Sequence, residues 1–164
     1  MDLIFILPVL ILILLALYLL FQGAIYVPSN EKAINAIIKM AKLKKGSKIA
    51  DLGSGDGRIV IAFARSGIQA HGFEINPFLV LFSRWNIKKE KLTDRASIHW
   101  QDFWKINFNP YNAVVVFGID YMMGRLEKKL RSEMRPGSKI LLNIFPFPKW
   151  PYSQKKHGVY LYKT

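Results

Sequence analysis

The chain has 164 residues and a formal net charge of +13 at pH 7, with 24 Lys and Arg against 11 Asp and Glu. It contains no cysteine, which excludes disulfides, thiolate metal sites and cysteine nucleophiles. Its three histidines lack the spacing of metal ligands, so no metal ion is expected. A positive charge of this size suits lipid headgroups, nucleic acid or an acidic protein as partners.

The first segment of the chain is apolar and uncharged. Residues 3–22 contain no charged side chain, and as a helix they would extend over about 30 Å, the thickness of the hydrocarbon core of a bilayer. A cleaved signal peptide would have a basic start and a shorter apolar run, whereas Asp2 stands at this start. A buried helix of a larger protein is the other alternative. We therefore expect residues 1–22 to form a transmembrane anchor.

The charges around this segment predict its orientation. Five lysines follow it, namely Lys32, Lys39, Lys42, Lys44 and Lys45. Only Asp2 and the amino terminus precede it, and basic flanks stay on the cytoplasmic side. The sequence predicts a single-pass membrane protein with a second domain, residues 23–164, on the cytoplasmic side (of the cytoplasmic membrane if the source is prokaryotic). Membrane lipid is then an expected partner.

Helical and strand patterns alternate along residues 23–164. We expect helices at 30–43, 57–67, 76–92 and 121–134, and strands at 48–52, 69–75, 96–100, 112–119, 138–145 and 158–164. Ser29 is the expected N-cap of the first of these helices, and Asn76 followed by Pro77 is a strong start for the third. This alternation is typical of an α/β fold with a doubly wound, mostly parallel sheet.

The most distinctive motif is DLGSGDG at residues 51–57, directly after the expected strand at 48–52. Ligands of doubly wound sheets bind at the carboxyl ends of the strands, where this motif is placed. Its pattern G-x-G-x-G differs from the G-x-G-x-x-G of dinucleotide-binding folds, and no Gly-Lys-Ser/Thr of a phosphate-binding loop follows. Glycines let a ligand approach the backbone closely, and carboxylates favour a cationic ligand.

The spacing Asp51-x-Gly53-x-Gly55-x-Gly57 resembles motif I of the class I, S-adenosylmethionine-dependent methyltransferases. The resemblance implies a Rossmann-like methyltransferase sheet and S-adenosyl-L-methionine as the cofactor. It also implies an acidic residue at the end of the next strand for the ribose hydroxyls, which would be Glu74. A further acidic residue is expected near the adenine after the third strand, which would be Asp102 with Phe103 beside it.

Several longer blocks are similar to one small group within this class. The blocks are YVPSNEKAINAIIKM, GFEINPFLVLFSRWN, DFWKINF, FGIDYMMGRLEKKL and FPFPKW. They resemble the membrane-anchored protein-lysine methyltransferases, a family that includes the mitochondrial enzyme for the ATP synthase c-subunit and a soluble archaeal relative. The resemblance covers roughly residues 26–150. It implies methyl transfer to a lysine side chain of a protein substrate, which we expect to be membrane-associated.

The resemblance also implies a set of cofactor-binding residues. They are Tyr26, Pro28, Ser29, Asp51, Gly53, Ser54, Gly55, Asp56, Gly57, Glu74, Asn76, Asp102 and Phe103. No catalytic residue can be assigned. Trp104, Phe145, Phe147 and Trp150 either line an apolar channel for the acceptor amine or pack in the core.

The sequence is also compatible with two other functions. The basic charge favours RNA or a small molecule as substrate, but residues 117–120, FGID, lack the Asn/Asp-Pro-Pro-aromatic loop of amino-group DNA and RNA methyltransferases, so nucleic acid is not expected. A scaffold that has lost its activity is the third possibility.

The basic face of the helix at 121–134 either is solvated or docks on anionic lipid. The stretch between residue 150 and the expected strand at 158–164 is short. The sixth of the seven strands that are usual in this class is therefore expected to be reduced or missing.

Overall fold

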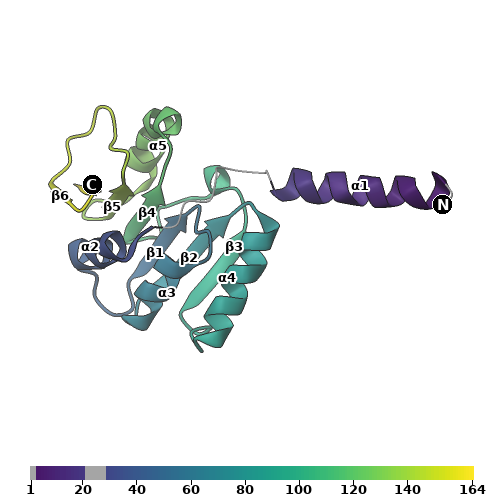
Figure 1. Ribbon diagram of the computed structural model, residues 1–164. Helices are drawn as coiled ribbons and strands as arrows, with labels where there is room; N and C mark the ends of the chain where they lie inside the picture. Colours follow the sequence, from purple (N-terminus) through teal and green to yellow (C-terminus); the bar gives the residue numbers. More distant parts are fainter. Residues whose placement is uncertain (1–2, 21–28) are drawn as a thin grey trace.

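The amino-terminal helix does not support the transmembrane anchor that the sequence predicts. The computed structural model describes residues 3–20 and 29–164, and helix α1 extends from Leu3 to Leu20 (Figure 1). Within the described part of the chain, no helix has the length and apolarity needed to cross a membrane. The predicted transmembrane anchor and the single-pass localisation are therefore wrong, and the cytoplasmic orientation and the lipid contact through this helix lose their basis.

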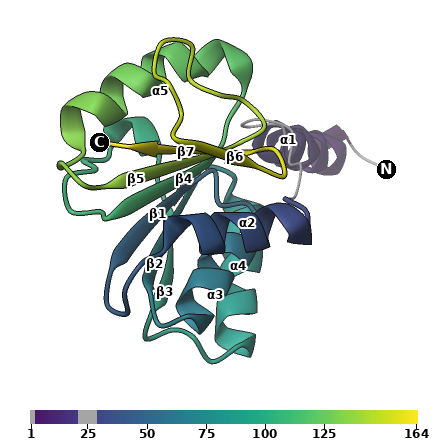
Figure 2. The same cartoon turned by 90° about the vertical axis from the view of Figure 1, so that its left-hand side faces the viewer.

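Residues 29–164 form a seven-stranded sheet with the strand order β3-β2-β1-β4-β5-β7-β6 (Figure 2). The strands are β1 (Lys48–Leu52), β2 (Gln69–Glu74), β3 (Ala96–Trp100), β4 (Ala113–Phe117), β5 (Lys139–Asn143), β6 (Gln154–Lys156) and β7 (Val159–Lys163). The first five pair in parallel, and β7 is antiparallel to both of its neighbours. The predicted doubly wound, mostly parallel α/β sheet is confirmed.

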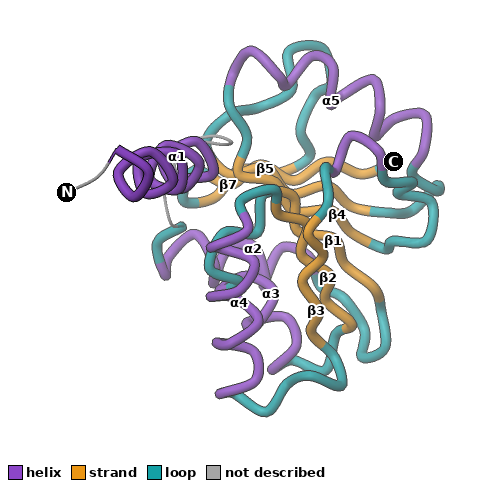
Figure 3. Tube along the Cα trace, turned by 90° about the vertical axis from the view of Figure 1, so that its right-hand side faces the viewer, coloured by secondary structure: helices purple, strands orange, loops and turns teal. Residues whose placement is uncertain are grey.

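Helices cover both faces of the sheet, as Figures 2 and 3 show. One face carries α2 (Glu31–Ala41), α3 (Arg58–Arg65) and α4 (Pro77–Lys89), and the other carries α5 (Asp120–Glu133). Alternate residues of β4 therefore enter different cores, because successive side chains of a strand point to opposite faces. Val115 packs on the side of α2 and α3, whereas Val114 and Val116 pack on the side of α5. Burial on both faces explains why this strand is continuously apolar.

The helix starts agree with the sequence at one cap and differ at another. The Asn76 side chain accepts hydrogen bonds from the backbone N–H groups of Phe78 and Leu79, as expected of an N-cap before Pro77. Helix α2, however, is capped by Asn30, whose side chain accepts from the N–H of Ala33. The predicted cap, Ser29, is buried and is used elsewhere, as described below.

The sixth strand is present but reduced. Strand β6 has three exposed residues at the edge of the sheet and joins β7 through a two-residue turn. His157 and Gly158 form this turn with φ values of 50° and 79°, both in the left-handed region that tight hairpins require. The short segment after residue 150 is thus sufficient for an edge hairpin.

Candidate functional site

The glycine-rich loop after β1 lies at the carboxyl edge of the sheet. Its glycines 53, 55 and 57 have φ values of 73°, 55° and 81°, which glycine adopts without strain. A Cβ atom on Gly57 would lie 3.0 Å from Cβ of Ser83 on α4, so this glycine permits close packing. A Cβ atom on Gly53 would meet no atom of the described residues within 4 Å. Gly53 therefore faces open space in which a ligand could lie.

Asp51, at the carboxyl half of β1, is buried beneath this loop. Its Oδ2 atom has no hydrogen-bond partner among the described residues, and neither has Oγ of the buried Ser54. Burial, and secondarily the nearby carboxylates of Glu74 and Asp56, raise the pKa of Asp51 to about 8. Buried polar atoms without a partner are rare in proteins, and an ordered water or a bound ligand would supply the missing contact.

Glu74 ends β2 next to the same loop. Its Oε2 accepts a hydrogen bond of 3.0 Å from the N–H of Gly55, and its Oε1 accepts bonds of 2.8 Å from the N–H groups of Ile75 and Asn76. The carboxylate is buried, so these three donors hold it in one orientation at the carboxyl ends of β1 and β2. The structure thus brings Asp51, Glu74 and the glycine-rich loop together.

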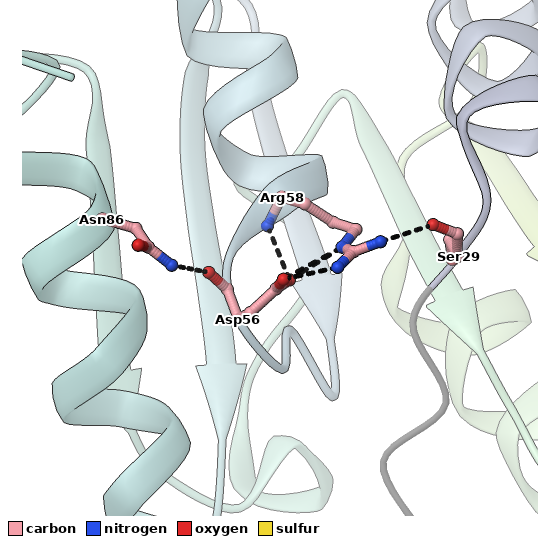
Figure 4. A network of polar contacts seen from close by, with 4 residues as sticks. All are labelled: Ser29, Asp56, Arg58 and Asn86. Carbon is pink, nitrogen blue, oxygen red and sulfur yellow. Dashed lines mark hydrogen bonds and ion pairs between the residues drawn. The ribbon is translucent and has the colours of Figure 1, made fainter. Parts of the chain in front are cut away.

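A polar network joins the loop to Ser29, two residues before the start of α2 (Figure 4). The Arg58 guanidinium donates to the Asp56 carboxylate, with a shortest contact of 2.7 Å, and to the backbone carbonyl of Ser29 at 3.0 Å. Asn86 of α4 donates to the backbone carbonyl of Asp56 at 3.0 Å. The Asp56 carboxylate therefore stabilises the loop, and its contact with the cofactor stays a prediction.

The network continues to the end of β5. Asn143 donates from Nδ2 to the hydroxyl of Ser29 at 3.1 Å, and both residues are buried. Ser29 thus stands between the loop after β1 and the end of β5. Sequence reasoning missed Arg58 and Asn143; the only signal for Asn143 was a polar residue that ends an otherwise apolar strand.

The remaining predicted ligands have different surroundings. The Asn76 oxygen caps α4, and Asp102 caps the short helix η1 (Phe103–Lys105) by accepting from the N–H of Trp104 at 3.0 Å. The Phe103 ring packs on that of Trp104 with 5.0 Å between their centroids. Tyr26 and Pro28 lie outside the described residues.

The aromatic residues expected near an acceptor channel divide into two groups. Phe147 stacks on Trp150 and packs on the buried Tyr162, which places this pair in the core beside α5. Trp104 and Phe145 follow β3 and β5 at the carboxyl edge of the sheet, so these two are candidates for a channel; like Trp150, both are half-buried against the core beside α5.

The basic face of α5 is largely engaged with neighbouring groups. Arg125 lies 4.2 Å from the Trp104 ring and Arg131 lies 4.4 Å from the Trp150 ring. Lys129 forms an ion pair of 2.6 Å with Glu133. Much of this face is therefore used in contacts within the fold.

The strand order, the antiparallel β7 and the glycine-rich loop paired with an acid after β2 define a class I methyltransferase fold. Sequence comparison gives the family. Residues 51–154 match the family described as "ANTKMT methyltransferase domain", and the chain belongs to this family.

Individual relatives agree with this assignment. The chain is 43% identical over 125 residues to the ATP synthase c-subunit lysine N-methyltransferase of Homo sapiens, which is 76% of this chain and 53% of that protein. It is 31% identical over 147 residues to a protein-lysine N-methyltransferase of Saccharolobus islandicus, covering 84% of this chain and 91% of that protein. The chain thus spans about half the length of the first of these relatives.

Among solved structures, an RNA methyltransferase from Salinibacter ruber in complex with S-adenosyl-L-homocysteine superimposes with a TM-score of 0.79 and 26% identity. The match covers 84% of this chain and 93% of that one.

Proposed function

We propose that the chain is a protein-lysine N-methyltransferase that uses S-adenosyl-L-methionine. The observation that carries the proposal is the buried Asp51 carboxyl group, whose Oδ2 lacks a partner beneath a loop that leaves space over Gly53. A site of this kind suits a small ligand with cationic groups, because a carboxylate without a partner stabilises positive charge. The human and archaeal relatives are named for lysine methylation, which supports the choice of acceptor.

The fit of this cofactor to the site is argued from the residues present. Asp51 would face the cationic amino group, the open space over Gly53 would admit the amino-acid portion, and Glu74 would accept from a ribose hydroxyl with the Oε2 lone pair that its three backbone donors leave free. Phe103, after β3, would lie against the adenine. When bound, S-adenosylmethionine supplies a methyl group on a sulfonium, which is an excellent leaving group.

The protein's own task is then alignment and desolvation. The pKa of a lysine amine in water is about 10.4, so at neutral pH the amine is an ammonium ion, which cannot attack. The acceptor site must therefore favour the neutral amine. Apolar surroundings do this by penalising the ammonium, and the half-buried Trp104 and Phe145 are the candidates for such surroundings. Holding donor and acceptor in line supplies most of the remaining rate enhancement. No residue is assigned as a general base.

RNA is the second candidate substrate, because the solved structure from Salinibacter ruber is that of an RNA methyltransferase. The net charge of +13 is compatible with it. The sequence FGID after β4 still argues against methylation of a base amino group.

Labelled cofactor distinguishes the two. The purified chain is incubated with labelled S-adenosylmethionine and a cell extract that contains both protein and RNA, and the products are hydrolysed and analysed by mass spectrometry. We expect label in methylated lysine, and none with the Gly53→Val variant as control. Label confined to methylated nucleosides would refute the lysine assignment in favour of RNA, and absence of any label would support an inactive scaffold.

A further inference from the structure

Helix α4 is apolar on two opposite faces. Its inner face buries Val80 and Ile87 against the sheet. Its outer face, which we call the α4 outer face, consists of Phe78, Leu81, Phe82 and Trp85. These residues follow the spacing i, i+3, i+4, i+7 of one helical stripe and are 45% to 64% exposed. An exposed stripe of large apolar side chains marks an interaction site.

The surface continues beyond the helix and is not covered by any other described part of the chain. Ile75 and Trp100 are also exposed, and the Trp100 indole donates to the carbonyl of Ile75 at 3.0 Å. The rings of Phe82 and Trp85 stack with 6.1 Å between centroids. Helix α4 lies at the outer side of the helical layer, beside the edge strand β3 (Figures 1 and 3).

Cationic side chains accompany this stripe. Lys88, Lys89 and Lys91 lie on or directly after α4 and are exposed, whereas the guanidinium of the exposed Arg84 donates to the carbonyl of Ile98 at 2.8 Å. Lys89 places its ammonium 5.3 Å from the centre of the Trp85 ring. The acid in this stretch, Glu90, forms an ion pair of 2.7 Å with Arg65, so positive charge dominates around the stripe.

We propose that the α4 outer face docks on the surface of a bilayer that contains anionic lipids. Tryptophan, phenylalanine and leucine enter the boundary between headgroups and acyl chains, and lysines beside them contact lipid phosphates while their stems remain in apolar surroundings. A protein partner suits the face less well, because the cores of protein interfaces are depleted in lysine. The docking concerns the bilayer surface, requires no segment to cross it and is independent of the proposed methyl transfer.

The absence of cysteine makes a local test possible. Leu81→Cys in the full chain gives a single attachment site for a nitroxide on the α4 outer face, and the side chain it replaces is 64% exposed. Asn109→Cys, in the exposed loop before β4, is the matched control on a polar surface. Vesicles of two parts phosphatidylcholine to one part phosphatidylglycerol serve as the probe. Electron paramagnetic resonance reports the access of oxygen and of a polar nickel reagent to each label, so contacts made by α1 do not enter the signal.

When vesicles are added, we expect the accessibility of the label at position 81 to the nickel reagent to fall several-fold and its accessibility to oxygen to rise. The label at position 109 should not change. Replacing Lys88 and Lys89 by Glu should weaken the effect at position 81, and salt should do the same. A label at position 81 that stays in water while the chain sediments with the vesicles would overturn the proposal. A label at 81 that changes only when a protein substrate is added would also overturn it and would assign the face to a protein.

Discussion

The Oε2 atom of Glu74 accepts a hydrogen bond of 3.0 Å from the backbone N–H of Gly55, which joins the end of β2 to the loop after β1. Because the same carboxylate is the proposed acceptor for the ribose hydroxyls, one residue both shapes the loop and holds the cofactor. Its replacement should therefore affect two quantities, the affinity for the cofactor and the stability of the empty protein.

Glu74→Ala should weaken binding of S-adenosylmethionine by about 1–3 kcal/mol, as expected for the loss of a hydrogen bond to a charged group. The free energy of unfolding should also fall, because three backbone N–H groups lose their acceptor. Calorimetric titration and chemical denaturation measure the two effects. Glu74→Gln keeps an oxygen acceptor but removes the charge, so its losses should be smaller. Unchanged affinity in the alanine variant would exclude Glu74 from the cofactor site.

Local sequence patterns predict much of this fold and one half of the site. The strands at 48–52 and 96–100 have the predicted bounds, because both are short apolar or alternating runs that turn residues limit on each side. Asp51 and Glu74 are brought together as predicted, because the carboxyl ends of neighbouring parallel strands share one edge.

Features that depend on distant contacts could not be predicted in the same way. Serine and asparagine are both good N-caps, and Ser29 lost that role because Asn143, 114 residues away in sequence, holds its hydroxyl. The Asp56 carboxylate forms an ion pair with Arg58, which in turn donates to the backbone of Ser29, and no local pattern shows this connection between distant segments. Strand β6 is three exposed residues long, too short and too polar for a strand pattern.

Gly53→Val should abolish cofactor binding while the protein still folds. The new side chain would occupy the open space over the loop, where the described residues offer no atom within 4 Å of the added Cβ. The φ of 73° makes any such variant strained by about 1–2 kcal/mol. Gly137→Val is a matched control, because Gly137 has a φ of 84° and equally open surroundings but lies outside the site. Calorimetric titration should show that Gly53→Val no longer binds the cofactor and that Gly137→Val still does. Loss of cofactor binding in both variants would attribute the effect to backbone strain.

Arg58→Gln should loosen the connection between the glycine-rich loop and Ser29. The guanidinium is held by the Asp56 carboxylate and by the Ser29 carbonyl, but its side chain is 39% exposed, so we expect a loss of about 1 kcal/mol in stability. Cofactor affinity should fall as well, because the loop is less well ordered. Arg95→Gln breaks an exposed pair with Asp94 and should change neither quantity. Denaturation and titration of both variants test this, and equal behaviour of the two would deny Arg58 a role in the site.

His71 and His99 should destabilise the fold in acid. Their ring nitrogens are 3.2 Å apart, with the Ser97 hydroxyl 3.0 Å from Nδ1 of His71. Burial, and for His71 also the neighbouring His99, lower the pKa of both rings below 6.5, so the folded state disfavours their protonation. Stability should then be lost as the pH falls below about 6.5, where the unfolded chain takes up protons first. His99→Gln should reduce this loss, and thermal denaturation against pH measures it.

Asp51 should couple cofactor binding to the release of a proton. Its pKa of about 8 means that the carboxyl group is protonated in the empty site at neutral pH. A cationic ligand favours the carboxylate, so affinity for S-adenosylmethionine should increase as the pH rises and should level off above about 8. Calorimetry in buffers of different ionisation enthalpy counts the protons released. An affinity that does not change with pH would contradict a contact between Asp51 and a cationic group.

The same group should make the empty protein less stable as the pH rises. The unfolded chain loses the Asp51 proton near its usual pKa of 3.8, whereas the folded chain retains it up to about 8. Between these values the folded state binds more protons, and the free energy of unfolding therefore decreases with increasing pH. Asp51→Asn removes this titration, so its melting temperature should exceed that of the unchanged chain by an amount that grows up to pH 8 and is then constant. The variant should also lose cofactor affinity, and a gap in melting temperature that is the same at every pH would show that Asp51 titrates alike in both states.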